Sequence, residues 1–408
     1  MNMTDASTVY IARQAIFDVD QKVVAYELLY RNGQENFATV TNASLATARV
    51  VTNALLEMGL AQLTAGTPAF INVPGEFLVA QGHTVLPPDA VVLELLESEV
   101  PDDVVRRAIA DLRREGYRVA LDDFGPGDIR ADLLDIADIV KVDVRSTPLE
   151  ALPSLHRELR GREVTTLAEK VETHAEFERL RLMGFELFQG FFFERPVVMS
   201  RNTLQPEALT MVKLFTELSR PDAEFSEVTR LIQSDVGLSH RLLKLVNSAA
   251  YGLSSRVASL REAVVYLGLN SVRNLVVLLS LAEVGGKPAE LSITALIRAR
   301  MCEALADGEA QSRDSAFTVG LLSVLDAFYD VPLQLLVDEL PLTTEVSRAL
   351  VAHEGMLGEI LDSAIAFQRG RWSETALRGL PGDDKLRDVY LDAVRWTEGI
   401  RRELRMEY

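Results

Sequence analysis

Cysteine is almost absent from this sequence, and long apolar runs are absent altogether. Cys302 is the single cysteine among 408 residues, which excludes an intramolecular disulfide and a zinc site built from several cysteines. The longest apolar run, NLVVLLSLAEV at 274–284, is far shorter than the roughly 18 residues that a membrane span needs. The first residues, MNMTDASTVYIARQ, contain no basic-then-apolar signal peptide. We therefore expect a cytoplasmic protein with no membrane association.

Positive charge is also scarce. The chain has 42 Lys and Arg against 60 Asp and Glu, which gives a formal net charge of −18. This balance argues against non-specific nucleic-acid binding through a basic face, so no DNA partner is expected. An anionic ligand would need local arginines or metal ions that overcome the overall negative field. The length predicts two domains, since single hydrophobic cores seldom grow beyond about 250–300 residues.

The first half of the chain alternates short apolar runs with amphipathic helical stretches such as 101–115. This alternation predicts an α/β fold with parallel strands covered on both faces, and a compact TIM-like barrel fits eight strands best. The short connection DVDQK at 18–22 predicts a hairpin between the first two strands. The predicted strands are residues 9–17, 23–30, 69–73, 91–96, 117–123, 138–143, 163–169 and 185–193.

From about residue 200 the pattern is helical and strand-like alternation stops. A proline and polar residues in ERPVVMSRN, at 194–202, mark the change. We therefore expect a barrel domain over 1–198 and an all-α domain over 199–408. The predicted helices of the second domain are residues 205–220, 224–234, 238–252, 259–269, 271–283 and 291–306.

Polar side chains interrupt the apolar strands near their C-terminal ends, where the loops of a parallel barrel collect its catalytic groups. A charged residue within a buried strand is costly unless it is paired or bound to metal. Oxygen ligands without His or Cys select Mg²⁺ or Mn²⁺, and two such ions about 3.5–4 Å apart are suited to phosphodiester hydrolysis. The adjacent aspartates would then be neutralised by metal. The residues are Glu27, Asn72, Glu94, Asp122, Asp123, Lys141, Glu169 and Gln189.

Each of these residues alone has a simpler explanation. A lone Glu or Lys near a strand end is commonly a salt-bridge partner, and Asp122–Asp123 could cap a turn. Structural pairing gives no reason, however, for polar residues at the same end of seven consecutive strands. The set as a whole therefore predicts the site.

These motifs resemble the EAL-type cyclic di-GMP phosphodiesterases over residues 9–196. The name-giving Glu-Ala-Leu-x-Arg motif is present as Glu27-Leu28-Leu29-Tyr30-Arg31, and the late Gln-Gly motif as Gln189-Gly190. The resemblance implies that Lys141 positions the attacking water, that Arg31 and Gln14 bind substrate, and that Glu27, Lys141 and Glu169 are catalytic. It implies that Glu97, Glu172 and Asp143 order the loop after the double aspartate. The implied ligands of two Mg²⁺ or Mn²⁺ ions are Glu27, Asn72, Glu94, Asp122, Asp123, Glu169 and Gln189.

The chain departs from this family at several positions. Pro126 and Asp128 replace the threonine and the common aromatic residue of the double-aspartate loop, and Ala15 replaces a proline next to Gln14. The segment after Arg31 lacks the family's proline-containing stretch. Lys170 replaces the glycine that usually follows Glu169, where it could pair with a ligand carboxylate and compete with metal. These changes weaken the predicted substrate grip more than the predicted metal site.

Residues from about 200 to 400 resemble the HDOD domain, a relative of the HD phosphohydrolases without their metal ligands. The matching stretches are 231–252, 260–281 and 317–328. Ser323 and Val324 stand where an active enzyme would have its His-Asp pair, so the resemblance implies a non-catalytic, regulatory or partner-binding half. The stretch LVNSAAYG also fits a helix end capped by Asn247, Ser248 and Gly252.

Two functions remain open. In the first, the barrel hydrolyses cyclic di-GMP to linear pGpG with two metal ions, and the HDOD half adjusts output or binds a signalling protein. In the second, the barrel is a degenerate nucleotide receptor or scaffold, and the HDOD half is the effector. The resemblance also implies a homodimer.

Overall fold

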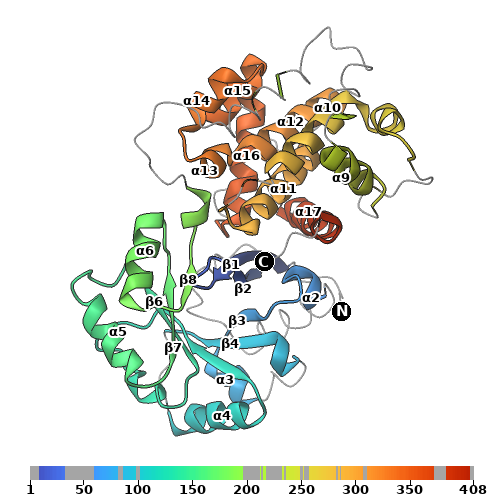
Figure 1. Cartoon of the computed structure of the whole chain (residues 1–408). Coiled ribbons are helices and arrows are strands. Elements are labelled where there is room, and N and C mark those ends of the chain that lie inside the picture. Colours follow the sequence, from blue (N-terminus) through green and yellow to red (C-terminus); the bar gives the residue numbers. More distant parts are fainter. Residues whose placement is uncertain are drawn as a thin grey trace. The chain divides into compact units, whose positions relative to one another are not determined.

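The structure is a computed structural model whose chain divides into two compact units (Figure 1). The barrel unit comprises residues 1–192 with 367–373, and the helical unit comprises 193–366 with 374–408. Each unit is described by itself below. The residues that the structure describes are 9–32, 59–80, 86–97, 102–195, 212, 215–216, 232–233, 236–248, 251, 257–281, 284, 286–306, 310–371 and 383–404.

The barrel unit contains a closed eight-stranded barrel in sequence order, which confirms the predicted fold. β1 runs antiparallel to both β2 and β8, whereas the strands from β2 to β8 are parallel to one another, so the predicted hairpin is also confirmed. The strands are β1 (Val9–Phe17), β2 (Val23–Asn32), β3 (Ala69–Val73), β4 (Val91–Leu95), β5 (Arg118–Leu121), β6 (Ile139–Asp143), β7 (Thr165–Glu169) and β8 (Leu187–Gln189).

The last predicted strand, 185–193, is too long. β8 ends at Gln189, and a 3₁₀ helix, η4 (Phe192–Glu194), follows. Gly190 follows the strand with φ 145°, and its backbone passes so close to Val171, two residues after β7, that a Cβ would lie 2.1 Å from the Val171 oxygen. Phe192 then stacks on Phe177 at a centroid separation of 4.8 Å. The ring of Phe192 therefore packs against α6 (His174–Met183) and does not belong to a strand.

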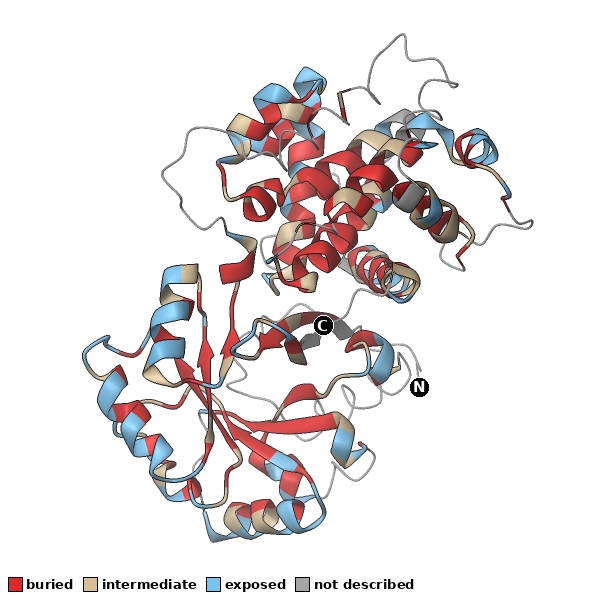
Figure 2. Ribbon diagram, in the orientation of Figure 1, coloured by how far each residue is buried: buried red, intermediate tan, exposed pale blue. Residues whose placement is uncertain are grey.

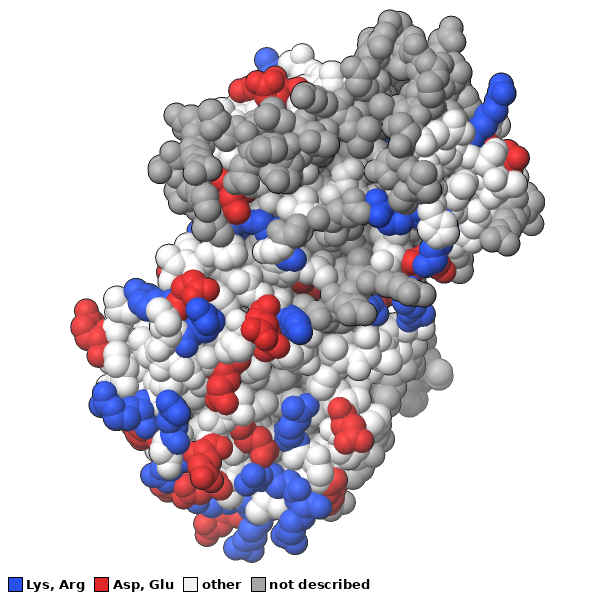
Figure 3. All heavy atoms as spheres, in the orientation of Figure 1, with Lys and Arg blue, Asp and Glu red and all other residues white. Residues whose placement is uncertain are grey.

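Helices cover the outside of the barrel. Figure 2 shows their outer faces exposed and the strands buried. α4 begins where Asp102 accepts hydrogen bonds from the backbone N–H groups of Val104 and Val105, and it occupies most of the predicted helix 101–115. Acidic and basic side chains are interspersed on the visible barrel surface (Figure 3). The helices are α2 (Leu60–Leu63), α3 (Gly75–Val79), α4 (Asp103–Arg114), α5 (Leu152–Arg160) and α6 (His174–Met183), with 3₁₀ helices η2 (Pro88–Ala90) and η3 (Ala131–Leu133).

The barrel interior has an apolar layer and a polar layer. One buried apolar residue from each of β1 to β7 forms a single cluster, against which Leu187 of β8 packs: Ile16, Ala25, Phe70, Val92, Ala120, Ile139 and Leu167. Because side chains alternate along a strand, the residue two positions further on faces the same interior. In the parallel strands these next positions are Glu27, Asn72, Glu94, Asp122, Lys141, Glu169 and Gln189. Strand geometry therefore gathers the polar set above the apolar layer.

The described part of the helical unit contains helices and no strand, in agreement with the all-α prediction. Gly268 has φ 79° and interrupts α10 where the predicted helices 259–269 and 271–283 meet. Most of 205–220 and 224–234 lies outside the described residues. The helices are α9 (Val236–Val246), α10 (Leu260–Leu281), α11 (Ala289–Leu305), α12 (Ala310–Leu322), α13 (Leu325–Tyr329), α14 (Leu333–Glu339), α15 (Thr344–Ala352), α16 (Gly355–Gln368) and α17 (Asp383–Leu404).

Helix length and hydropathy bear on the predicted lack of a membrane span. Among the described helices, none taken singly combines the length and the apolar character that crossing a membrane requires.

Gly320 allows α11 and α12 to pack closely. A Cβ at this position would lie 2.6 Å from the Cα of Ala299 on α11. We expect Gly320→Ala to lower the free energy of unfolding by about 1–3 kcal/mol, because overpacking forces the helices apart. Urea denaturation followed by circular dichroism measures the change, with Ser312→Ala on the exposed side of α12 as the control. Equal stability of the two variants would contradict the close approach.

Candidate functional site

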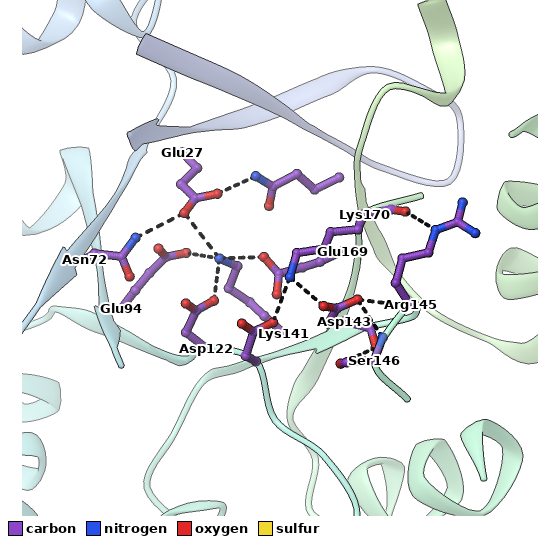
Figure 4. Close-up of polar contacts among 12 residues, drawn as sticks. Glu27, Asn72, Glu94, Asp122, Lys141, Asp143, Arg145, Ser146, Glu169 and Lys170 are labelled. Atoms are coloured by element: carbon purple, nitrogen blue, oxygen red, sulfur yellow. Dashed lines mark hydrogen bonds and ion pairs between the residues drawn. The ribbon is translucent and has the colours of Figure 1, made fainter. Parts of the chain in front are cut away.

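A buried ammonium group lies among four carboxylates inside the barrel. Lys141 Nζ on β6 lies 2.8 Å from Glu94 Oε1, Asp122 Oδ1 and Glu169 Oε1, and 3.6 Å from Glu27 Oε1. The Lys141 and Glu94 side chains have no exposed area. Figure 4 shows the carboxylates converging on this nitrogen from different strands. We call Glu27, Glu94, Asp122 and Glu169 the carboxylate cage.

Amide side chains hold Glu27 in place. Asn72 Nδ2 donates a hydrogen bond of 3.1 Å to Glu27 Oε1, and Gln189 Nε2 donates to Glu27 Oε2. Gln189 Nε2 also donates to Gln14 Oε1 at 3.0 Å. Gln14 comes from β1, which runs in the opposite direction, so the antiparallel strand closes the polar layer. Four sequence-predicted residues therefore meet at one edge of the cage.

One ammonium does not compensate four carboxylates, so some of the acids retain protons. Burial raises the pKa of Glu169 to about 8 although the Lys141 charge opposes it. Burial likewise raises the pKa of Glu94 well above its ordinary value against the same opposing charge. Burial alone would lower the pKa of Lys141, but Asp122, Glu169 and the other carboxylates raise it well above its usual range. The cage therefore holds a charged lysine beside acids that ionise late.

A second acidic group lies at the mouth of the barrel. Glu97, Asp122 and Asp123 place carboxylate oxygens within 4.8 Å of one another, and we call them the outer acidic cluster. Asp123 follows β5 with φ 46°, which turns the chain immediately after the strand. Burial, and then the neighbouring Asp122 charge, raise the pKa of Asp123. Asp122 belongs to both groups and joins them.

Lys170 and Asp143 lie beside the outer acidic cluster. Lys170 Nζ is 2.5 Å from Asp143 Oδ2 and 3.5 Å from Asp123 Oδ1. Asp143 Oδ1 accepts from the backbone N–H of Arg145 at 2.7 Å. Burial works to raise the pKa of Asp143, but hydrogen bonds from Lys170 and the Arg145 N–H lower it below its ordinary value.

Glu172, implied by the resemblance to order the loop, is ion-paired elsewhere. The distance between Arg145 Nη2 and Glu172 Oε2 is 3.4 Å, and Glu176 lies closer to the same guanidinium at 2.8 Å. Glu176 also forms the capping box of α6 with Thr173. The structure therefore brings Asp143 to the site through Lys170, while Glu172 lies at the start of α6. The Arg31 side chain lies outside the described residues.

Buried oxygen atoms without hydrogen-bond donors test whether divalent cations fit this site. Within the described residues, Glu94 Oε2, Glu169 Oε2 and Gln189 Oε1 are buried and accept no hydrogen bond. Such orphaned acceptors are costly unless a cation or water satisfies them. Carboxylate and amide oxygens are the ligands that Mg²⁺ and Mn²⁺ prefer. The donor set therefore fits divalent cations.

Arg130 is a site residue that the sequence analysis missed. Its side chain is fully buried and donates to the backbone oxygens of Leu95 at 3.2 Å and Asp122 at 2.7 Å. Asp128 holds the guanidinium through an ion pair of 2.7 Å. Arg130 therefore ties the ends of β4 and β5 together beneath the double aspartate. The signal was Asp128 itself, whose unusual identity is matched by an arginine two residues later.

In the helical unit, the place of the missing His-Asp pair is filled by a different polar group. Arg298 Nη1 donates to Ser323 Oγ at 3.0 Å, and Arg298 Nη2 pairs with Glu194 Oε2 at 3.1 Å. Asn247 ends α9 by donating to Leu243 and Val257 oxygens and accepting from the Val257 N–H, as a cap would. No cluster of potential metal ligands occurs in the described part of this unit.

Removing Lys141 leaves the carboxylate cage without its central cation. We expect Lys141→Met to lower the free energy of unfolding by about 3–5 kcal/mol in metal-free buffer, the usual cost of breaking a buried ion pair. Urea denaturation in the presence of EDTA near neutral pH measures this. Lys22→Met, in the exposed β1–β2 turn, is the control. A loss no larger than that of the control would show that the cage does not depend on the lysine charge.

Glu169 gives the stability of the metal-free protein a pH dependence. The folded state keeps its proton up to about pH 8, whereas the unfolded state releases it near the ordinary value of 4.5, so stability falls as pH rises between these values. The slope reaches at most about 1.4 kcal/mol per pH unit. Glu169→Gln lacks this term, so its stability relative to wild type should increase from about pH 5 to pH 8. Parallel profiles for the two proteins, in EDTA and with Glu178→Gln as control, would contradict the raised pKa.

Comparison with known families finds two matching domains. Residues 9–196 match the EAL domain, and residues 205–332 match the HDOD domain. The cyclic di-GMP phosphodiesterase CdgJ of Vibrio cholerae is 34% identical over 97% of this chain and 94% of its own length. The uncharacterized protein YuxH of Bacillus subtilis is 30% identical over 96% of this chain and 98% of its own length.

Solved structures are similar to about half of the chain. A calcium and cyclic di-GMP complex of BlrP1 from Klebsiella pneumoniae is 29% identical and covers 48% of this chain and 58% of its own, with a TM-score of 0.39. The EAL-domain protein YkuI of Bacillus subtilis, also with cyclic di-GMP and calcium, is 20% identical and covers 55% and 71%, with a TM-score of 0.39.

The EAL match precedes the HDOD match along the chain, and the similarity to the Vibrio cholerae protein extends over both. This chain belongs to the family of proteins in which an EAL domain is followed by an HDOD domain.

Proposed function

We propose that this protein hydrolyses cyclic di-GMP to linear pGpG at the barrel mouth. The observation that carries the proposal is the carboxylate cage, in which four strands bring acids to one buried lysine. Burying several charged side chains has a desolvation cost that packing alone does not offset, which favours a functional role for them. Similarity to a named cyclic di-GMP phosphodiesterase over nearly the whole chain supports the same substrate. The domain limits that accompany this proposal are 1–198 and 199–408.

Cation binding would be shared between the two acidic groups. The proposed ligands of two Mg²⁺ or Mn²⁺ ions are Glu27, Asn72, Glu94, Asp122, Asp123, Glu169 and Gln189, whose donors are hard oxygens. Such ions supply polarisation of the phosphate and a lowered pKa for water. Gln189 Oε1, which is buried and accepts no hydrogen bond within the described residues, supports this assignment. Glu97 and Asp143 would order the loop that carries Asp123, and Glu172 would act on the same loop.

Lys141 has the position and charge to orient a water molecule. Glu94, Asp122 and Glu169 each lie 2.8 Å from its ammonium and take up its three protons, so Lys141 would donate to a water once cations bind these carboxylates. Hydrolysis would join the water oxygen to phosphorus and break one phosphoester bond, which opens the cyclic dinucleotide. Arg31, near the end of β2, would bind a phosphate of the substrate. Gln14, on β1, would also contact the substrate.

A cyclic di-GMP receptor without turnover is the second candidate. The observation that favours it is the ion pair between Lys170 Nζ and Asp123 Oδ1, which places a positive charge at a proposed ligand. Such a barrel would still bind nucleotide or act as a scaffold, but it would fill its cation positions incompletely.

The helical unit would act by binding a signalling protein. Val265 and Tyr266 on α10 are 70% and 55% exposed, and exposed apolar side chains that lie together commonly mark interaction surfaces. The polar group around Arg298 gives this unit a structural centre where an HD enzyme would hold metal. We further propose that the protein is a homodimer and acts in the cytoplasm, where the buried thiol of Cys302 stays reduced.

Incubation of the purified chain with cyclic di-GMP and Mn²⁺ tests the proposal. We expect pGpG to form and Glu27→Ala to reduce the rate by at least about 100-fold, because Glu27 joins the cage to both amides. Glu178→Ala, an exposed acid on α6, should keep the wild-type rate. Binding without pGpG would establish the receptor, and absence of both would leave a scaffold.

A further inference from the structure

Lys170 extends from the end of one strand to the acid at the end of another. It follows β7 directly, and its Nζ lies 3.5 Å from Asp123 Oδ1 beyond β5. Its backbone is fixed by Arg145, whose Nε donates to the Lys170 oxygen at 3.3 Å. Figure 4 shows the lysine nitrogen directed at the acids beside the carboxylate cage. The position of the ammonium is therefore set by both the strand end and its partners.

The ammonium lies beside Asp123, one of the three members of the outer acidic cluster. Asp123 Oδ1 is buried and accepts no hydrogen bond within the described residues, so the ion pair with Lys170 is its principal interaction there. Asp123 shares the cluster with Asp122 and Glu97. The lysine ammonium is positively charged near neutral pH, because the ordinary pKa of lysine is about 10.4.

The backbone shows that the lysine side chain is retained at a cost. Lys170 has φ 57°, a left-handed conformation that glycine adopts freely and other L-residues adopt with strain. A glycine here would remove both the strain and the charge. The turn therefore does not require a lysine, whose side chain contacts Asp123 and Asp143.

We propose that the Lys170 ammonium is a built-in competitor for a divalent cation at the outer acidic cluster, so that a second cation binds only by displacing the lysine. The proposal rests on the proposed two-cation site. Asp143 makes displacement feasible, because it pairs with the same ammonium at 2.5 Å and can keep the lysine after Asp123 is released. Within the described residues Lys170 forms ion pairs with Asp123 and Asp143 and with no acid of the carboxylate cage, so it opposes a cation at the outer acidic cluster more than one at the cage.

Isothermal titration of the full chain with MnCl₂, without nucleotide, tests this. Lys170→Met removes the charge and keeps the bulk, whereas Lys170→Gly removes both and suits the backbone. In each variant the weaker Mn²⁺ step should tighten about two- to fivefold, the value of one partly exposed ion pair, and the tighter step should not change. Lys22→Met, an equal charge change in the β1–β2 turn at the opposite end of the parallel strands, should behave as wild type.

Three outcomes would overturn the inference: an unchanged weaker step in both Lys170 variants, an equal gain in Lys22→Met, or no second step in any protein. A gain in Lys170→Gly but not in Lys170→Met would also overturn it, because bulk and not charge would then be responsible. Thermal unfolding confirms that each variant is folded. The titration contains no nucleotide, so its result does not depend on turnover. A tightened weaker step, together with no pGpG in the separate hydrolysis assay, would uphold the role of Lys170 as a competitor and refute the proposed hydrolysis.

Discussion

A lysine surrounded by carboxylates in the interior of a barrel is the constraint on which this site depends. Lys141 has no exposed area and touches acids from three other strands at 2.8 Å. With Glu27 included and all groups ionised, four negative charges face one positive charge, which leaves three in excess. Buried charge of one sign is unstable unless protons, a lysine or metal ions offset it. Burial raises the pKa of Glu94 and Glu169 and the neighbouring carboxylates raise it further, while the same carboxylates keep Lys141 charged.

The barrel makes such a concentration of charge possible by separating it from the core. An apolar layer fills the interior, and the polar residues lie two positions further along each parallel strand. Arg130 then closes the loop below the double aspartate without adding an uncompensated charge, because Asp128 pairs with it. Lys170 contacts Asp123 in the same loop. The inner carboxylate cage is thus set by strand geometry, whereas the outer acidic cluster depends on loop residues specific to this chain.

The sequence predicted the strand-based part of this account, and of the loop-based part it predicted only that Lys170 could pair with a ligand carboxylate. Polar residues such as Asn72 and Lys141 near the C-terminal ends of apolar strands predicted that these side chains meet at one edge of a barrel, and the short turn at 18–22 predicted the hairpin of the first two strands. Contacts between residues of different elements follow no local sequence period. The hydrogen bonds by which Arg130 joins the ends of β4 and β5 could therefore not be predicted from the sequence. The early end of β8 was missed because Phe192 reads as a strand residue until its packing on Phe177 is seen. The reach of Lys170 to Asp123 depends on two loops at once, although its unusual identity pointed to the site.

Anomalous diffraction from crystals of the full chain grown with excess Mn²⁺ and cyclic di-GMP tests the central claim most directly. The account predicts two manganese peaks, one contacted by residues of the carboxylate cage and one contacted by Asp122 and Asp123. Peaks bound only at other surfaces, or an ordered nucleotide at the barrel mouth with no manganese beside these acids, would contradict it.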